Sequence, residues 1–248
     1  MKDKYELAKA ASEIRRLLGE DDHSHIDIFR LAHTIEKLTL VFYPMGERIS
    51  GMCLKGNEDV LIAINSSMTY GRQRYSMAHE LFHYYYDDMT TVICMRDIGE
   101  TSDIESQANT FASFFLAPPA ALSAEIRERK KNRSKLGLAD VVKFEQSFGL
   151  SRQAMLIRLI DEGELSQEDT VPMRTNIISN ALLLGYDDAL YRSSPEEKVK
   201  MTYGRYIKLA EDLLNRGLIS DGKYEELLLE AFRADLVYGF NEGGELLD

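Results

Sequence analysis

The order of β-rich and helical segments is the feature that most constrains the fold of this chain. Three short apolar runs, residues 38–43, 49–54 and 60–64, follow one another with only turn residues between them. Connections this short leave no room for crossover helices, so we predict a small antiparallel sheet in the N-terminal third. Before the sheet, the apolar periodicity predicts a helix starting near Leu7 and a second over residues 26–37.

Helical periodicity dominates the chain after the sheet. The expected helices are residues 70–87, 102–116, 119–129, 138–148 and 152–161. A chain whose strands come first and whose helices follow is typical of the α+β class. We therefore predict an α+β fold with its sheet at the N-terminal side.

A polar, acidic stretch over residues 164–170 indicates a boundary between two units. We expect a main domain over residues 1–165 and an all-α C-terminal unit over residues 172–248. In the second unit, the run that begins at Ser194 places a proline and a capping-box glutamate in the order typical of a helix start. Ser220 is expected to begin a partner helix, so the two helices should form an antiparallel hairpin.

Charge and cysteine content exclude several classes of function. The formal net charge of −11 opposes nonspecific binding to nucleic acid or anionic lipid, because both would be repelled by the average surface. Cys53 and Cys94 lie in apolar stretches and are expected to be buried, reduced thiols with no part in a metal site. The first residues lack the apolar core of a secretory signal, and no apolar run approaches membrane-spanning length. These features predict a cytoplasmic protein without a membrane partner.

The run from Ala78 to His83 carries the pattern His-Glu-x-x-His. On a helix, positions i and i+4 lie about 40° apart around the axis and about 6 Å apart along it, so His79 and His83 can reach one tetrahedral ion. Bound zinc lowers the pKa of a water ligand towards neutrality, and Glu80 is placed to take the proton and pass it to a departing amine. The pattern predicts a Zn²⁺ site for amide hydrolysis with Glu80 as the catalytic base.

Two histidines leave such a site short of a third protein ligand. Glu105 is the preferred candidate, because it begins a predicted helix whose alanines allow close approach to a second helix. Asn109, one turn later, is expected to bond the outer nitrogen of a ligand histidine and fix its tautomer. The alternatives are the carboxylates Asp87, Asp88, Glu100 and Asp103 and the histidines His23 and His25.

Tyrosines and arginines flank the histidine motif. Tyr84 is a candidate donor to the oxyanion of the tetrahedral intermediate, although the sequence does not choose between it and the two tyrosines that follow. Arg72 and Arg74 precede the motif by one to two turns, and they are equally suited to structural ion pairs and to substrate binding.

Two further segments carry weaker signals of nucleic-acid or partner binding. Residues 138–161 have the outline of a helix-turn-helix, with a glycine turn and a serine N-cap. Glu145 stands where such motifs need a small residue, so we interpret the pair as a packing element. The basic run over residues 127–135 is expected to be a solvated loop, with docking of an acidic partner or nucleic acid as the alternative.

The stretch from Arg72 to Tyr84, followed by Glu105 to Ala112 and by Leu116-Ala117-Pro118, resembles the ImmA/IrrE family of bacterial metallopeptidases. The resemblance covers about residues 26–164, although Phe82 replaces a glycine that is common in the motif. It implies His79, His83 and Glu105 as zinc ligands and Glu80 as the catalytic residue. It also implies a helix-turn-helix repressor as the protein that is cleaved or inactivated.

The sequence therefore predicts an intracellular zinc endopeptidase with a zincin-like domain, acting on a regulatory protein. One alternative is a zinc-containing protein that sequesters a repressor without cleaving it. Another is a DNA-binding regulator acting through residues 144–161. The presence of Glu80 favours the peptidase, and the acidic balance of the chain disfavours the DNA-binding protein.

Overall fold

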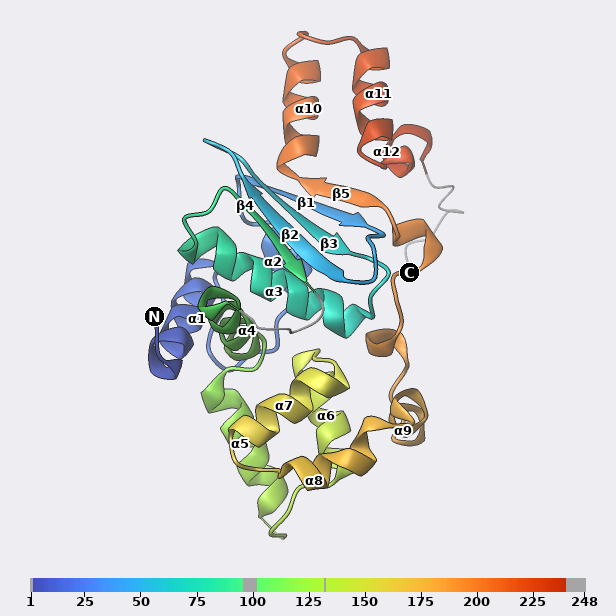
Figure 1. Ribbon diagram of the computed structural model, residues 1–248. Coiled ribbons are helices and arrows are strands. Elements are labelled where there is room, and N and C mark those ends of the chain that lie inside the picture. The colour runs from blue at the N-terminus through green and yellow to red at the C-terminus, as the bar shows by residue number, and fades with distance from the viewer. Residues whose placement is uncertain (1, 96–101, 132, 240–248) are drawn as a thin grey trace.

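A computed structural model describes residues 2–95, 102–131 and 133–239 and shows a mixed sheet packed against helices (Figure 1). The strands are Leu38–Tyr43 (β1), Ile49–Lys55 (β2), Val60–Asn65 (β3), Thr91–Met95 (β4) and Met201–Gly204 (β5). The helices before residue 165 are Lys4–Leu17 (α1), Ile28–Ala32 (α2), Tyr70–Tyr86 (α3), Asp103–Leu116 (α4), Pro119–Lys130 (α5), Leu138–Phe148 (α6) and Arg152–Asp161 (α7). Those after it are Gln167–Thr170 (α8), Ile177–Leu183 (α9), Arg205–Asn215 (α10), Asp221–Glu230 (α11) and Ala234–Tyr238 (α12).

The α+β class is confirmed, but the prediction of a purely antiparallel sheet is wrong. The strand order is β4-β2-β3-β1-β5, and β3 lies beside β1 in parallel, with Leu38 opposite Val60. The other neighbouring strands are antiparallel. The central place of β3 follows from its uninterrupted apolar run, because a strand covered on both faces needs apolar side chains on both. Residues 44–48 carry the chain from β1 past β3 to β2 without a helix.

The prediction of an all-α C-terminal unit is also wrong, because β5 pairs antiparallel with β1. Met201 and Thr202 are buried there, opposite Phe42 and Val41. The free edge of β1 offers these residues backbone partners and an apolar surface, and this tertiary pairing overrides the local helix signal.

The C-terminal helices keep part of the predicted hairpin. The hydroxyl of Ser194 donates to the side chain of Gln73 at 3.1 Å instead of capping a helix, and the first long helix begins only at Arg205. Ser220 does cap α11, with its hydroxyl accepting from the amide of Lys223. α10 and α11 pack side by side and project beyond the edge of the sheet (Figure 1).

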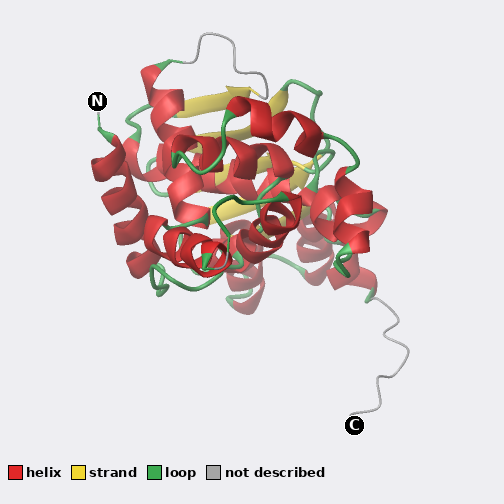
Figure 2. Cartoon of the chain, turned by 90° about the horizontal axis from the view of Figure 1, so that it is seen from below, coloured by secondary structure: helices red, strands yellow, loops and turns green. Residues whose placement is uncertain are grey.

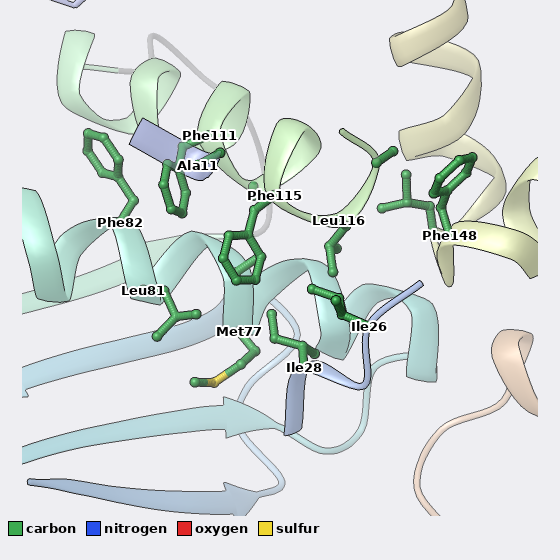
Figure 3. Close-up of a cluster of buried hydrophobic side chains, with 14 of the residues drawn as sticks. Ala11, Ile26, Ile28, Met77, Leu81, Phe82, Phe111, Phe115, Leu116 and Phe148 are labelled. Atoms are coloured by element: carbon green, nitrogen blue, oxygen red, sulfur yellow. The ribbon is translucent and has the colours of Figure 1, made fainter. Parts of the chain in front are cut away.

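Helix α3 crosses one face of the sheet and is covered on its other side by α4, against which α1 packs (Figure 1). Seen from below, helices lie in front of the strands (Figure 2). Phe111 and Phe115 of α4 are fully buried beside Met77 and Leu81 of α3 (Figure 3). Truncating a phenylalanine in such a core costs about 3–5 kcal/mol, so this contact holds α4 firmly against α3. Within the ranges that the structure describes, no helix is both long and apolar enough to cross a membrane.

Candidate metal centre

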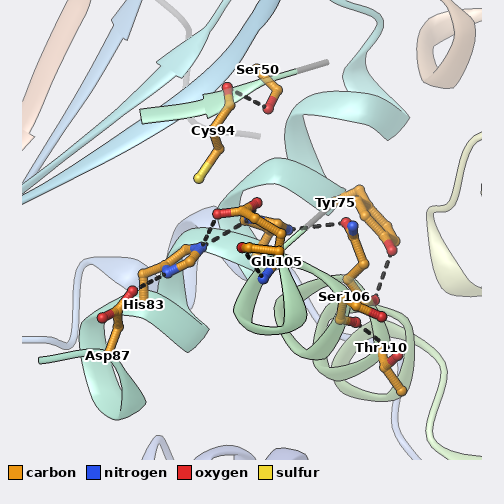
Figure 4. A network of polar contacts seen from close by, with 11 residues as sticks. Ser50, Tyr75, His83, Asp87, Cys94, Glu105, Ser106 and Thr110 are labelled. Carbon is orange, nitrogen blue, oxygen red and sulfur yellow. Dashed lines mark hydrogen bonds and ion pairs between the residues drawn. The ribbon is translucent and has the colours of Figure 1, made fainter. Parts of the chain in front are cut away.

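The His-Glu-x-x-His motif lies in the middle of α3, where the helix is enclosed by the sheet and α4. The side chains of His79, Glu80 and His83 are all buried. His79 and His83 share the helix face directed at α4, and Glu105 approaches them from the first turn of α4 (Figure 4). The burial of three ionisable groups in one place is costly unless they bind one another or a cation.

The three side chains converge on one point. The Nε2 atoms of His79 and His83 are 3.1 Å apart, and the carboxylate oxygens of Glu105 lie 3.1 Å from Nε2 of His79 and 3.3 Å from Nε2 of His83. Zinc bonds of 2.0–2.1 Å in tetrahedral geometry place neighbouring ligand atoms about 3.3 Å apart. The three ligand atoms therefore have the spacing of one triangular face of a zinc tetrahedron.

The outer nitrogen of each imidazole has a partner of its own. Nδ1 of His79 lies 3.1 Å from Oδ1 of Asn109, and Nδ1 of His83 lies 2.8 Å from Oδ2 of Asp87. Both partners can accept, so with a metal bound each imidazole would carry its proton on Nδ1 and present the lone pair of Nε2 to the centre. Asn109 has the position that the sequence predicted, whereas Asp87 serves as an orienting carboxylate and not as the third ligand.

Without a cation, the cluster shares protons among its own groups. Burial opposes ionisation of Glu105, but hydrogen bonds from His79 and His83 prevail and lower its pKa to about 2. Burial likewise opposes the charged form of His83, and its bonds to Glu105 and Asp87 prevail and raise its pKa. A divalent cation at the same point would replace the shared proton, so the donor set fits zinc.

Glu80 is fully buried beside the cluster, and neither of its carboxylate oxygens meets an N–H or O–H donor among the described residues. Burial raises its pKa, against the opposing effects of His79 and the Cys94 thiol. Space for this carboxylate depends on Gly51 of β2, where an added Cβ would lie 2.7 Å from Oε1 of Glu80. An orphaned carboxylate in this place is explained if a ligand of the metal normally bonds to it.

Cys94 of β4 is the member of the cluster that the sequence analysis missed. His79, His83, Cys94 and Glu105 each offer one ligand atom, and these four atoms lie within 4.8 Å of one another. Both cysteines are buried and free, as predicted, and Cys94 lies close enough to the histidines and Glu105 to offer a ligand atom, which its sequence position did not indicate. No sequence signal could have found it, since strand pairing of β4 with β2 brings it over α3.

A cavity of about 780 Å³ opens beside His79 and Glu105. Its walls come from α3, α4 and α7, with Lys4 and Tyr5 of α1 and Ile93 of β4 at its borders. Its lining mixes charged groups with exposed apolar side chains, including Ile157 of α7. This is the space from which a ligand can reach the cluster.

The tyrosines and arginines that flank the histidine motif differ in whether they line the cavity. Tyr84 does not line the cavity, because five residues rotate it about 140° around α3 from His79, so its prediction as an oxyanion donor is not supported. Arg72 does line the cavity, whereas Arg74 donates to the carbonyl groups of Gly149 and Ile26 and is structural. Tyr75, which was not singled out, borders the cavity and donates to the Asn109 carbonyl at 2.7 Å.

The alternative ligands that lie among the described residues are not part of the cluster. Asp88, Asp103, His23 and His25 are absent from the metal-competent group found among the described residues. His25 instead lies 3.4 Å from a carboxylate oxygen of Glu125. Glu100 falls outside the residues that the structure describes.

The helix-turn-helix-like pair α6 and α7 faces inward. Glu145 of α6 is buried, forms an ion pair with Arg152 and accepts a hydrogen bond of 2.7 Å from the hydroxyl of Tyr191. The second helix, α7, supplies Gln153 and Ile157 to the cavity wall. These contacts support the interpretation of the pair as a packing element.

The basic run is partly neutralised within the chain. Lys130 bonds to Glu164 at 2.7 Å, and Arg133 is paired with Asp140. Asn132, in the middle of the run, falls outside the described residues. The two pairs leave less positive charge for a partner than the sequence suggests.

Comparison with known proteins gives the same assignment as the motif. A family model described as the IrrE N-terminal-like domain matches residues 43–160. The radiation response metalloprotease IrrE of Deinococcus deserti is similar, with 39% identity over 74 residues, which are 30% of this chain and 23% of that protein. The chain thus matches about a quarter of the length of this curated relative. These matches support an ImmA/IrrE family assignment for residues 43–160, which include the histidine motif and Glu105.

Proposed function

We propose that this protein is a zinc-dependent endopeptidase with a zincin-like active site and that its substrate is a regulatory protein, a helix-turn-helix repressor in particular. The observation that carries the proposal is the triangle of His79, His83 and Glu105, whose ligand atoms have the spacing of a zinc tetrahedron beside an orphaned Glu80. A family whose named relative is a metalloprotease supports the same chemistry.

Each residue of the centre has a distinct task in peptide hydrolysis. His79, His83 and Glu105 would hold zinc, which when bound polarises a carbonyl group and acidifies water. Glu80 takes a proton from the attacking water and delivers it to the amine of the leaving peptide, and its raised pKa suits a group that must both accept and release a proton. Asn109 and Asp87 keep the imidazoles in the tautomer that leaves Nε2 free.

The cavity has room for a short segment of a polypeptide substrate. It has a volume of about 780 Å³, residues of α7 and α1 line it, and it reaches from the cluster to Tyr5 and Ile157. Its apolar and charged walls can bind side chains on either side of a scissile bond. The exposed residues Gln153 and Ile157 of α7 border the cavity, which weakens the DNA-binding alternative because a recognition helix needs its exposed face free for a groove.

The sequestration alternative keeps the zinc site but needs no chemistry at Glu80. The burial of a carboxylate that meets no N–H or O–H donor among the described residues favours the enzyme, since this burial is unfavourable and sequestration alone does not require it.

The experiment compares zinc content and cleavage in the wild type, Glu105→Ala and Asp103→Ala. The wild type should bind about one zinc per chain and cut a helix-turn-helix repressor encoded beside its gene, with loss on chelation and recovery on adding zinc. Glu105→Ala should lose both properties, and Asp103→Ala, changed on the same helix turn, should keep both. A Glu105→Ala protein that keeps its zinc and its cleavage would contradict the proposed ligand set.

A further inference from the structure

The fourth position of the centre is not left open to solvent in this structure. Cys94 is 1% exposed, and its sulfur is directed towards the carboxylate of Glu105 and the ring of His83 (Figure 4). The position of its backbone is fixed by strand pairing with Gly51 and by a hydrogen bond of 3.2 Å from the Ser50 hydroxyl to its carbonyl. The thiol is therefore placed over the triangular face formed by the other three residues.

We infer that Cys94 is a fourth protein ligand, so that the resting protein holds its metal in a closed site made of His79, His83, Glu105 and Cys94. The four ligand atoms already lie within 4.8 Å of one another. Tetrahedral zinc with bonds of about 2.3 Å to sulfur and about 2.0–2.1 Å to nitrogen needs separations of about 3.5 Å, so a shift of the order of 1 Å completes the site. Thiolate is among the ligands that zinc prefers.

The chemistry of this step balances within the chain. Forming the metal–sulfur bond breaks the S–H bond of Cys94, and the proton needs an acceptor in a place that excludes water. Glu80 is that acceptor, because it is buried beside Cys94 and no N–H or O–H group occupies its oxygens.

The closed site is a resting state of the proposed peptidase, and this role rests on the proposed function. A metal with four protein ligands is typical of a structural site, whereas catalysis needs an open position. β4 is an edge strand, and among the described strands its partner is β2 alone. Displacing Cys94 therefore disturbs one strand ladder and leaves α3 and α4 in place, which allows a bound substrate to open the centre.

The test is zinc X-ray absorption spectroscopy of the full-length, zinc-loaded protein. The wild type should show one sulfur neighbour at about 2.3 Å together with nitrogen and oxygen neighbours, and Cys94→Ala and Cys94→Ser should show only the latter. Cys53→Ala is the matched control, because Cys53 is buried on the adjacent strand β2 and is not in the cluster. Circular dichroism checks that each variant is folded, and the serine variant preserves the volume of the thiol.

A cobalt-loaded series gives a second reading that does not depend on activity. The wild type and Cys53→Ala should show the near-ultraviolet charge-transfer band of a cobalt–thiolate bond, and both Cys94 variants should lack it. One metal per chain without any sulfur signal in the wild type would overturn the fourth ligand and leave the peptidase proposal standing. A sulfur signal in a protein that cleaves no peptide bond would support the closed site and count against the peptidase. Wild-type protein that binds neither metal would overturn both.

Discussion

The side-chain oxygen of Asn109 lies 3.1 Å from Nδ1 of His79, across the contact between α4 and α3. This bond links the tautomer of a ligand on one helix to the position of the other helix. Because Asn109 follows Glu105 by one turn on α4, one helix both completes the metal triangle and orients one of its histidines. Correct packing of α4 is thus a condition for the site.

Asn109→Ala is expected to lower zinc affinity by about 10- to 100-fold, because His79 loses the acceptor that fixes its Nδ1 proton. Asn109→Asp keeps an acceptor in the same place and should retain affinity. Competition with a chromophoric chelator measures both constants. Equal affinity of the alanine variant and the wild type would show that the bond does not orient His79.

Gly51→Ala is expected to reduce peptide cleavage without loss of zinc. The new methyl group would meet Oε1 of Glu80 at 2.7 Å and the carbonyl of Ala63 at 3.1 Å, so the carboxylate must move. A displaced general base lowers the rate by up to about 10²–10⁴-fold. Gly46→Ala is the control, because no atom lies within 4 Å of its added Cβ. Full activity of Gly51→Ala would show that the position of Glu80 is not limited by β2.

Truncation tests how far the C-terminal segment belongs to the fold. A chain of residues 1–204 keeps β5, whereas one of residues 1–171 also loses the bond from Tyr191 to Glu145 and the carbonyl of Met173 that Arg152 uses. Buried groups left unpaired cost about 1–3 kcal/mol each, so the shorter chain should melt at least about 5 °C lower. Equal melting temperatures of the two truncated chains would instead support the predicted independent unit that begins at residue 172.

Features that depend on local signals could be predicted from the sequence. The i, i+4 histidines and the boundaries of α7 follow from helical periodicity, and the Ser220 cap follows from its side chain. Glu105 and Asn109 could be placed because a stripe of alanines on α4 allows close helix packing.

The remaining features depend on contacts between distant segments. β5 forms because β1 has a free edge, although the local sequence around Ser194 favours a helix. Cys94 reaches the cluster only through the pairing of β4 with β2, and no periodicity within β4 marks it. Glu145 stands where a helix-turn-helix needs a small residue, and its burial could not be predicted because its partners, Arg152 and Tyr191, come from other elements.

The most direct test of the proposed peptidase activity compares cleavage of the candidate repressor by the wild type and by Glu80→Gln. The glutamine keeps the size of the side chain but cannot take a proton, so cleavage should fall by about 10²–10⁴-fold while zinc content is unchanged. Mass spectrometry follows the length of the repressor, and a promoter assay follows relief of repression. We expect the wild type to shorten the repressor and relieve repression, and Glu80→Gln to do neither. Relief of repression by both proteins, with the repressor at full length in each, would contradict the proposed activity and favour sequestration.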